Sequence, residues 1–248
     1  MAEKLLAVIG GTGLTELEGL EIVEEISYES EWGQPSAPLL VGKYEGKRII
    51  FLARHGNPHR IPPHQVNYRA NIHVLRQAGV TDVLSVNAVG GIHPSMGPAH
   101  VNIPDQIIDY TYGRGDTFFE GDLLEVTHID FTYPYDRELR EQVILAAHEA
   151  AVPVSSAGVY GCTQGPRLET AAEIARMERD GCDVVGMTGM PEAALAAEMK
   201  IRYASIALVV NWAAGKSDHI ITMDEIYEAI RVGMGSVKSI LGQFIRNY

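Results

Sequence analysis

Six segments of the sequence combine glycine with polar side chains at the end of an apolar run. Glycine lets backbone N–H groups approach an anion closely, and threonine, arginine and histidine add side-chain donors. One such loop is often only a tight turn, but six of them at strand ends indicate one shared pocket for an anionic ligand. The segments are Gly10–Gly13, Ala53–Gly56, Val86–Gly91, Gly165–Thr170, Gly186–Glu192 and Val210–Gly215.

Two of these segments are candidates for phosphate binding. The first, Gly10–Gly13, lacks the dinucleotide spacing G-x-G-x-x-G and the lysine of a P-loop, so a bare glycine turn is the alternative. In the second, Arg54 offers a planar fork of donors that matches phosphate oxygens, and His55 can donate beside it. The alternative for this pair is a surface position or a structural ion pair.

Apolar runs typical of strands alternate with segments of helical periodicity. The predicted strands are Leu5–Ile9, Leu39–Val41, Ile49–Ala53, Val83–Val86, Val154–Val159, Val184–Val185 and Tyr203–Val210. The predicted helices are Val66–Gln77, Arg137–Ala150, Ala171–Arg179, Pro191–Met199 and Asp224–Arg246. This alternation predicts an α/β fold: a single domain over residues 1–248 with a twisted mixed β-sheet flanked by helices.

The composition excludes several classes of protein. The chain has 248 residues, 46% of them apolar, with no long apolar stretch that predicts a membrane span and no signal peptide. Its formal charge of -12, without a basic cluster, argues against nucleic acid and anionic membranes as partners. The two cysteines, Cys162 and Cys182, are too few for a disulfide scaffold, and a cytoplasmic location is expected.

In their order and spacing, the six segments resemble the trimeric purine nucleoside phosphorylases and their relatives that phosphorolyse 5'-methylthioadenosine. The resemblance extends from Gly10 to the last helix, and its most specific parts are Gly10–Gly13, Ala53–Gly56 with His64–Asn71, Gly165–Thr170 and Met187–Glu192. It implies a single α/β domain, a homotrimer, inorganic phosphate as co-substrate and no metal or organic cofactor. The expected reaction is transfer of a pentosyl group from a purine to phosphate.

The resemblance also implies roles for individual residues. Phosphate is expected to contact Thr12, Arg54, His55, Asn87, the backbone of Ala88 and Thr188. Asn87 stands where close relatives often carry threonine or serine. Ribose is expected at Met187, and His128 resembles a histidine that a neighbouring subunit supplies to the 5' end. The purine is expected between Leu168, Glu169, Asn211 and Ala213. Catalysis is assigned to Arg54 and His55, which are expected to position phosphate, and to Asn211, which is expected to stabilise charge at purine N7.

The purine contacts favour a 6-oxopurine. Adenine-selective members of this family typically carry aspartate at the positions of Asn211 and Ala213, whereas here the first is a carboxamide and the second has no acceptor. The carboxamide can donate to a 6-oxo group and accept from protonated N7, while Glu169 can accept from N1–H. A solvated helix-cap carboxylate is the alternative role for Glu169.

The 5' group of the substrate is expected to be apolar. Alignment with the methylthio enzymes puts Ile221 and Met223 at this end, although both side chains can simply pack under the last helix. With the oxo-purine site, this predicts S-methyl-5'-thioinosine as substrate, and hypoxanthine and 5-methylthioribose 1-phosphate as products. The alternatives are a phosphorylase of inosine or guanosine that uses His219, a methylthioadenosine phosphorylase, a nucleoside hydrolase, and a non-catalytic nucleoside-sensing protein.

Overall fold

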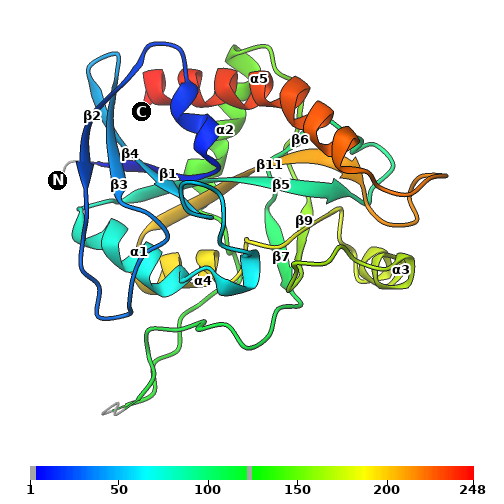
Figure 1. Ribbon diagram of the computed structural model, residues 1–248, viewed down its shortest axis with the longest axis horizontal. Helices are drawn as coiled ribbons and strands as arrows, with labels where there is room; N and C mark the ends of the chain where they lie inside the picture. The colour runs from blue at the N-terminus through cyan, green and yellow to red at the C-terminus, as the bar shows by residue number, and fades with distance from the viewer. Residues whose placement is uncertain (1–3, 122–124) are drawn as a thin grey trace.

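The computed structural model describes residues 4–121 and 125–248, with the side chain of Thr12 outside this description. One mixed sheet runs through the molecule with helices on both faces (Figure 1). Its strands are β1 Leu6–Gly10, β2 Leu20–Ile26, β3 Leu39–Tyr44, β4 Lys47–Ala53, β5 Asp82–Gly91, β6 Val101–Asn102, β7 Gln106–Asp109, β8 Val154–Ser155, β9 Val159–Cys162, β10 Val184–Gly186 and β11 Arg202–Trp212. The predicted α/β class and mixed sheet are confirmed.

The described residues form five α-helices around the sheet. They are α1 Tyr68–Gln77, α2 Arg137–Glu149, α3 Ala171–Arg179, α4 Glu192–Glu198 and α5 Met223–Asn247, with two short 3-10 helices, η1 Thr12–Glu16 and η2 Pro63–Gln65. In Figure 1, α2 and α5 lie on one face of the central strands and α1 and α4 on the other. Side-chain caps begin several helices: Asn67 caps α1, and Thr170 and Thr222 form capping boxes on α3 and α5.

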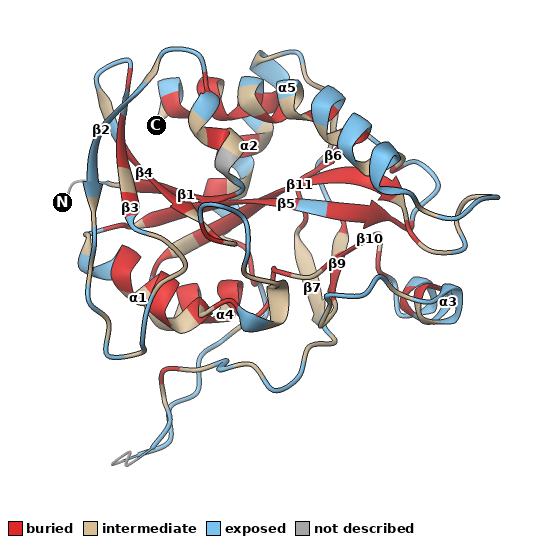
Figure 2. Cartoon of the chain, in the orientation of Figure 1, coloured by how far each residue is buried: buried red, intermediate tan, exposed pale blue. Residues whose placement is uncertain are grey.

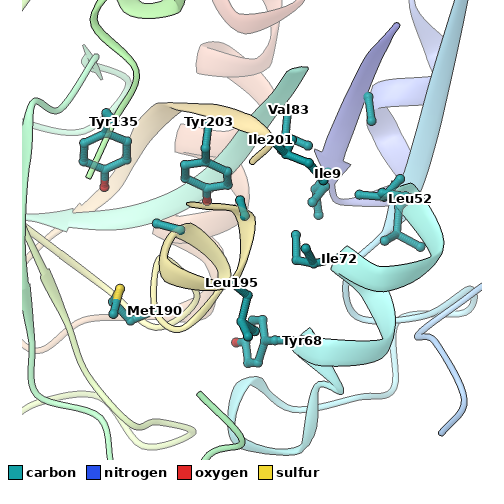
Figure 3. Close-up of a cluster of buried hydrophobic side chains, with 14 of the residues drawn as sticks. Ile9, Leu52, Tyr68, Ile72, Val83, Tyr135, Met190, Leu195, Ile201 and Tyr203 are labelled. Carbon is teal, nitrogen blue, oxygen red and sulfur yellow. The ribbon is translucent and has the colours of Figure 1, made fainter. Parts of the chain in front are cut away.

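Each face of the sheet has its own apolar core. The core beneath α1 and α4 holds Ile9, Ile72 and Leu195, and Figure 3 shows these side chains meeting between the strands and the two helices. The opposite core lies under α2 and α5 and includes Leu6, Val143 and Phe244. Because β1, β5 and β11 are buried on both sides, they consist almost entirely of apolar residues.

Two features of the sheet differ from the predicted strands. The predicted strand Val154–Val159 is two separate strands: β8 pairs with β6, and β9 pairs with β7 and β10. Strand β5 continues five residues beyond the predicted Val83–Val86, through Gly90 to Gly91. A side chain at Gly91, the last residue of β5, would meet the backbone oxygen of Met96 at 1.9 Å, so this glycine allows a close approach of two chain segments.

Candidate active site

A gap in the sheet marks the candidate site. On one edge of β5, β1 pairs with residues 82–85 and β10 pairs with Gly90 and Gly91, so the four residues between have no strand beside them there. Ala88 is the one exposed residue of β5, visible as a pale blue stretch on an otherwise buried strand (Figure 2). Strands β1 and β4 both end at the edge of this gap, at Gly10 and Ala53.

The backbone of Ala88 faces the gap. The Val86 carbonyl points toward this edge, because it accepts from Arg54 Nη1 at 3.1 Å. Backbone polar groups of a strand alternate between its two edges, so Ala88, two residues later, presents its N–H on the same side as Val86. An unpaired strand N–H that faces such a gap is a ready anion donor.

Arg54 is held in a buried network directly beside the gap. Its Nε donates to Glu192 Oε2 at 2.7 Å, and its Nη2 donates to Glu192 Oε1 at 2.9 Å and to Ser85 Oγ at 2.6 Å. Burial lowers the pKa of the guanidinium and the Glu192 carboxylate raises it, and the net result is a raised pKa. With the Val86 contact, one N–H of Nη1 is left for a ligand.

Asn87 is buried and reaches the site through Thr188. Its Nδ2 donates to Thr188 Oγ1 at 2.7 Å, and its Oδ1 accepts from Ser205 Oγ at 2.9 Å. Because the Thr188 oxygen accepts from Asn87, its hydroxyl is left to donate, and the Tyr160 hydroxyl lies beside it as one acceptor. The contact with Thr188 is possible because β10 runs antiparallel to β5 and its continuation lies beside Asn87, whereas Ser205 comes from β11, which pairs in parallel with β5.

His55 follows β4 next to Arg54 and is neutral at physiological pH. Burial and the charge of Arg54 lower its pKa to about 4, against a smaller raising effect of its contact with Ile61. Its Nδ1 lies 2.8 Å from the Ile61 carbonyl oxygen, which can only accept, so Nδ1 carries the proton. The ring also stacks on His59 with 4.5 Å between ring centroids.

The predicted purine residues come from two adjacent loops. Glu169 is partly buried and its Oε1 accepts from Thr163 Oγ1 at 2.6 Å, so its carboxylate is not simply a solvated helix cap. The neighbouring Leu168 is 45% exposed. Asn211 is buried beside Gly90 and donates one Nδ2 proton to the Trp212 carbonyl at 2.7 Å. The loop after β11 packs on the start of α3, because Gly215 lies against Ala171.

The predicted 5' residues are less closely grouped. Ile221 lines a cavity of about 530 Å³ that also includes Asn211, Trp212 and His219. Met223 is 55% exposed and is not part of this lining. His219 pairs with Glu225 at 2.8 Å, and His128 is exposed on the chain that extends away from the body in Figure 1.

Several residues of the site were not identified from sequence. Glu192, Ser85 and Tyr203 surround Arg54, and the Tyr203 hydroxyl donates to Glu192 Oε1 at 2.9 Å. Glu192 was detectable in principle, since it is a single carboxylate within the apolar run Gly189–Ala197 and a buried carboxylate needs a partner. Thr12, a predicted phosphate ligand, has its side chain outside the described residues. Within the described ranges, no cluster of side chains is suited to hold a metal ion.

The sequence and the fold are both similar to known phosphorylases. The model of the phosphorylase superfamily matches residues 5–246. A probable S-methyl-5'-thioinosine phosphorylase of Pseudomonas syringae pv. tomato is 59% identical over 96% of this chain and 97% of its own. The 6-oxopurine nucleoside phosphorylase of Pyrococcus furiosus is 42% identical over 91% and 86%. Methylthioadenosine phosphorylase of Schistosoma mansoni with adenine superposes with a TM-score of 0.93 at 29% identity, covering 99% and 92%.

Proposed function

The chain belongs to the phosphorylase superfamily, and on that premise we propose that it cleaves S-methyl-5'-thioinosine with inorganic phosphate. The products are hypoxanthine and 5-methylthioribose 1-phosphate. The observation that carries this proposal is the agreement between the purine contacts and the relatives: Asn211 and Ala213 stand where adenine selectivity needs carboxylates, and several relatives, the first at 59% identity, are probable S-methyl-5'-thioinosine phosphorylases.

Phosphate is proposed to bind at the gap beside β5. The donors available there are the remaining N–H of Arg54, the hydroxyl of Thr188 and the N–H of Ala88, with His55 at the rim. In this arrangement phosphate lies beneath the ribose and stabilises the positive charge that develops as the glycosidic bond breaks. Its oxygen then bonds to C1' of the sugar, so no side chain needs to act as a nucleophile.

The purine is proposed to leave toward the loops after β9 and β11. The Oε2 atom of Glu169 can accept from N1–H, because Oε1 is taken by Thr163. Asn211 has one N–H left for the 6-oxo group, and its carbonyl oxygen can accept from protonated N7. The phosphate gives up its proton as its oxygen bonds to C1', and a proton passed through water is taken up at N7, so the hypoxanthine leaves neutral with this N7–H held by the Asn211 carbonyl. We further propose a homotrimer that acts in cytoplasmic purine salvage.

A 6-oxopurine nucleoside phosphorylase that accepts inosine is the second candidate. It is favoured by His219, a polar side chain that lines the same cavity as Ile221, and by the 42% identity to the Pyrococcus furiosus enzyme. Methylthioinosine and inosine differ only in the 5' group, so a direct comparison separates the two candidates.

The deciding experiment measures kcat/KM for methylthioinosine, inosine and methylthioadenosine with phosphate present and absent. Preference for methylthioinosine, with turnover that requires phosphate, supports the proposal. Preference for inosine assigns the second candidate, preference for methylthioadenosine contradicts the role of Asn211, and turnover without phosphate indicates a hydrolase.

A double substitution tests the base contacts. Asn211→Asp with Ala213→Asp should shift preference toward 6-amino purines, because carboxylates accept from an exocyclic amino group and repel a 6-oxo group. Discrimination by mismatched buried hydrogen bonds reaches about 10⁴–10⁵-fold in favourable cases, so a change of at least tenfold in the ratio of kcat/KM values is expected. An unchanged ratio would show that the purine is recognised by other residues.

A further inference from the structure

Arg114 contacts several backbone carbonyls behind the candidate site. Its Nη1 donates to the carbonyls of Met187, at 2.9 Å, and Met190, and its Nη2 donates to those of Thr163, at 3.2 Å, and Gln164, at 2.9 Å. Its Nε donates to the Gln164 side chain at 3.1 Å. One guanidinium therefore joins the loop after β9 to the loop after β10.

These two loops carry the groups proposed to bind the substrates. The first loop holds Glu169 through the Thr163 hydroxyl. The second contains Met187 and Thr188, the residues proposed to contact ribose and phosphate. The loops also touch directly, since Met187 lies against Gly165. Their relative position sets the distance between the purine contacts and the phosphate contacts.

The chemistry of the contact suits arginine alone. A guanidinium presents five N–H donors in one plane, whereas the ammonium of lysine is a single point and cannot reach carbonyls on both loops. The ring of Tyr68 fixes the plane of the guanidinium, with its centroid 5.3 Å from the central carbon. In the described part of the chain, no carboxylate pairs with Arg114. Apart from a contact of Nη1 with the Tyr68 hydroxyl at 3.3 Å, its donors go to the two loops.

We propose that Arg114 is a positioning residue, which holds the purine-binding and phosphate-binding loops at the separation that one nucleoside requires. It touches no reacting atom. The inference rests on the proposed function in one respect: one loop must bind the purine and the other must bind the ribose and phosphate. A displacement of about 1 Å between such groups lowers a rate by about 100-fold.

The test uses Arg114→Ala and Arg114→Lys in the full-length protein, with added guanidinium. We expect both variants to lose about 100-fold or more in kcat/KM, mainly in kcat, while circular dichroism and gel filtration match the parent. Guanidinium at millimolar concentration should restore Arg114→Ala several-fold, whereas methylammonium should not. If Arg114→Ala does not fold, the same comparison is made for Arg114→Lys without rescue.

Arg140 supplies a matched control. It also donates to backbone carbonyls, of Ile103, Pro104 and Ser156, but these segments carry none of the proposed substrate contacts. Arg140→Ala should keep kcat/KM within about threefold of the parent. The proposal is overturned if Arg140→Ala loses as much activity as Arg114→Ala, if Arg114→Lys is fully active, or if guanidinium restores nothing.

A failure of the proposed function remains distinguishable from a failure of this inference. The assay uses whichever nucleoside the parent protein cleaves, so a different 5' group leaves the comparison intact. If the parent cleaves none, calorimetric binding of hypoxanthine and of phosphate is measured instead. Arg114→Ala should then weaken both, and unchanged affinity for both would contradict the positioning role.

Discussion

At the scale of single residues, the buried ion pair of Arg54 and Glu192 is the most consequential contact of the site. Both side chains are almost fully buried, and Glu192 also accepts from Ser85 and Tyr203. A buried charge that loses its partner is strongly destabilising, because neither water nor another group replaces the contact. The pair therefore fixes both the stability of this region and the direction of the one N–H left for a ligand.

Glu192→Gln tests this pair, because it removes the charge and keeps the shape. We expect a loss of about 3–5 kcal/mol in the free energy of unfolding, measured by urea denaturation. The exposed pair Arg137 and Glu141 provides the control: Glu141→Gln should change stability by less than about 1 kcal/mol. Equal stability of the parent and Glu192→Gln would mean that Arg54 finds another partner or is solvated.

His55 allows a prediction of how stability depends on pH. Its pKa of about 4 in the folded protein lies below the usual value of 6.5, so between these values the unfolded chain binds more protons. The contribution of His55 to stability is therefore complete above pH 6.5 and is lost as the pH falls toward 4. NMR should show the ring resonances of His55, assigned with His55→Gln, unchanged from pH 8 to pH 5.5. A midpoint near 6.5 would contradict this.

Residue types at the site were predictable, but their partners were not. The segments that hold Arg54, Asn87, Ala88 and Thr188 were selected from their place after apolar runs, while the phosphate roles of these residues came from the family resemblance, and the structure gathers them around one gap. The sequence left open whether Arg54 binds phosphate or forms an ion pair, and the structure shows the ion pair with one donor remaining. Glu192 lies 138 positions away, a distance at which sequence pattern carries no pairing information.

At the scale of elements, long buried strands and capped helices were predictable and short edge strands were not. The apolar runs of β1, β4 and β11 and the capped helix α3 lie within a few residues of their predicted bounds. β2 was missed because five of its seven residues are exposed and three are glutamates. β6 and β7 have two and four residues, too few for any periodicity to appear, and the two residues of β8 were merged with the start of β9 in the predicted strand Val154–Val159.

Helix α5 contains a matched pair of glycines that should respond in opposite directions. A side chain at Gly233 would lie 2.3 Å from Leu208 in the core, whereas nothing lies within 4 Å of the same position at the exposed Gly235. Gly233→Ala should therefore destabilise the protein by about 1–3 kcal/mol. Gly235→Ala should stabilise it by about 0.5–1 kcal/mol, because alanine loses less conformational freedom in a helix.

Thermal and urea unfolding of the two variants measure these changes. The parent is the reference, and the double variant should show the sum of the two effects if the sites act separately. No effect of Gly233→Ala would mean that α5 packs on β11 less closely than the contact with Leu208 indicates, and destabilisation by Gly235→Ala would mean that position 235 is not open to solvent.

At the scale of the whole molecule, residues 113–121 and 125–133 form a loosely packed part of the described chain. Its described residues have no regular secondary structure and extend away from the sheet (Figure 1). They include apolar side chains in water, among them Val126 at 75% and Tyr133 at 79% exposure. The fold of a single chain does not explain why these apolar side chains are exposed, whereas a subunit interface that covers them would. The α/β class was predictable from alternation alone, whereas assembly rests on family resemblance.

Sedimentation equilibrium tests the proposed trimer. The parent should have the mass of three chains, and Tyr133→Asp should lower the mass, because a carboxylate would be buried in the interface. Lys238→Asp, far along α5, serves as a control that should keep the parent mass. A monomeric parent would contradict the trimer and would leave His128 without a role at the 5' end.

The gap beside β5 has a consequence for the rate at which backbone amides of this strand exchange hydrogen for deuterium. A central strand normally has the slowest-exchanging amides of a protein, since both of its edges are bonded. Here the N–H of Ala88 lies in such a strand but faces the gap, where no strand pairs with it. In deuterated water it should exchange orders of magnitude faster than its buried neighbours, and phosphate should slow it. The exchange rate of this one amide would thus measure binding of phosphate at the site even when no reaction takes place.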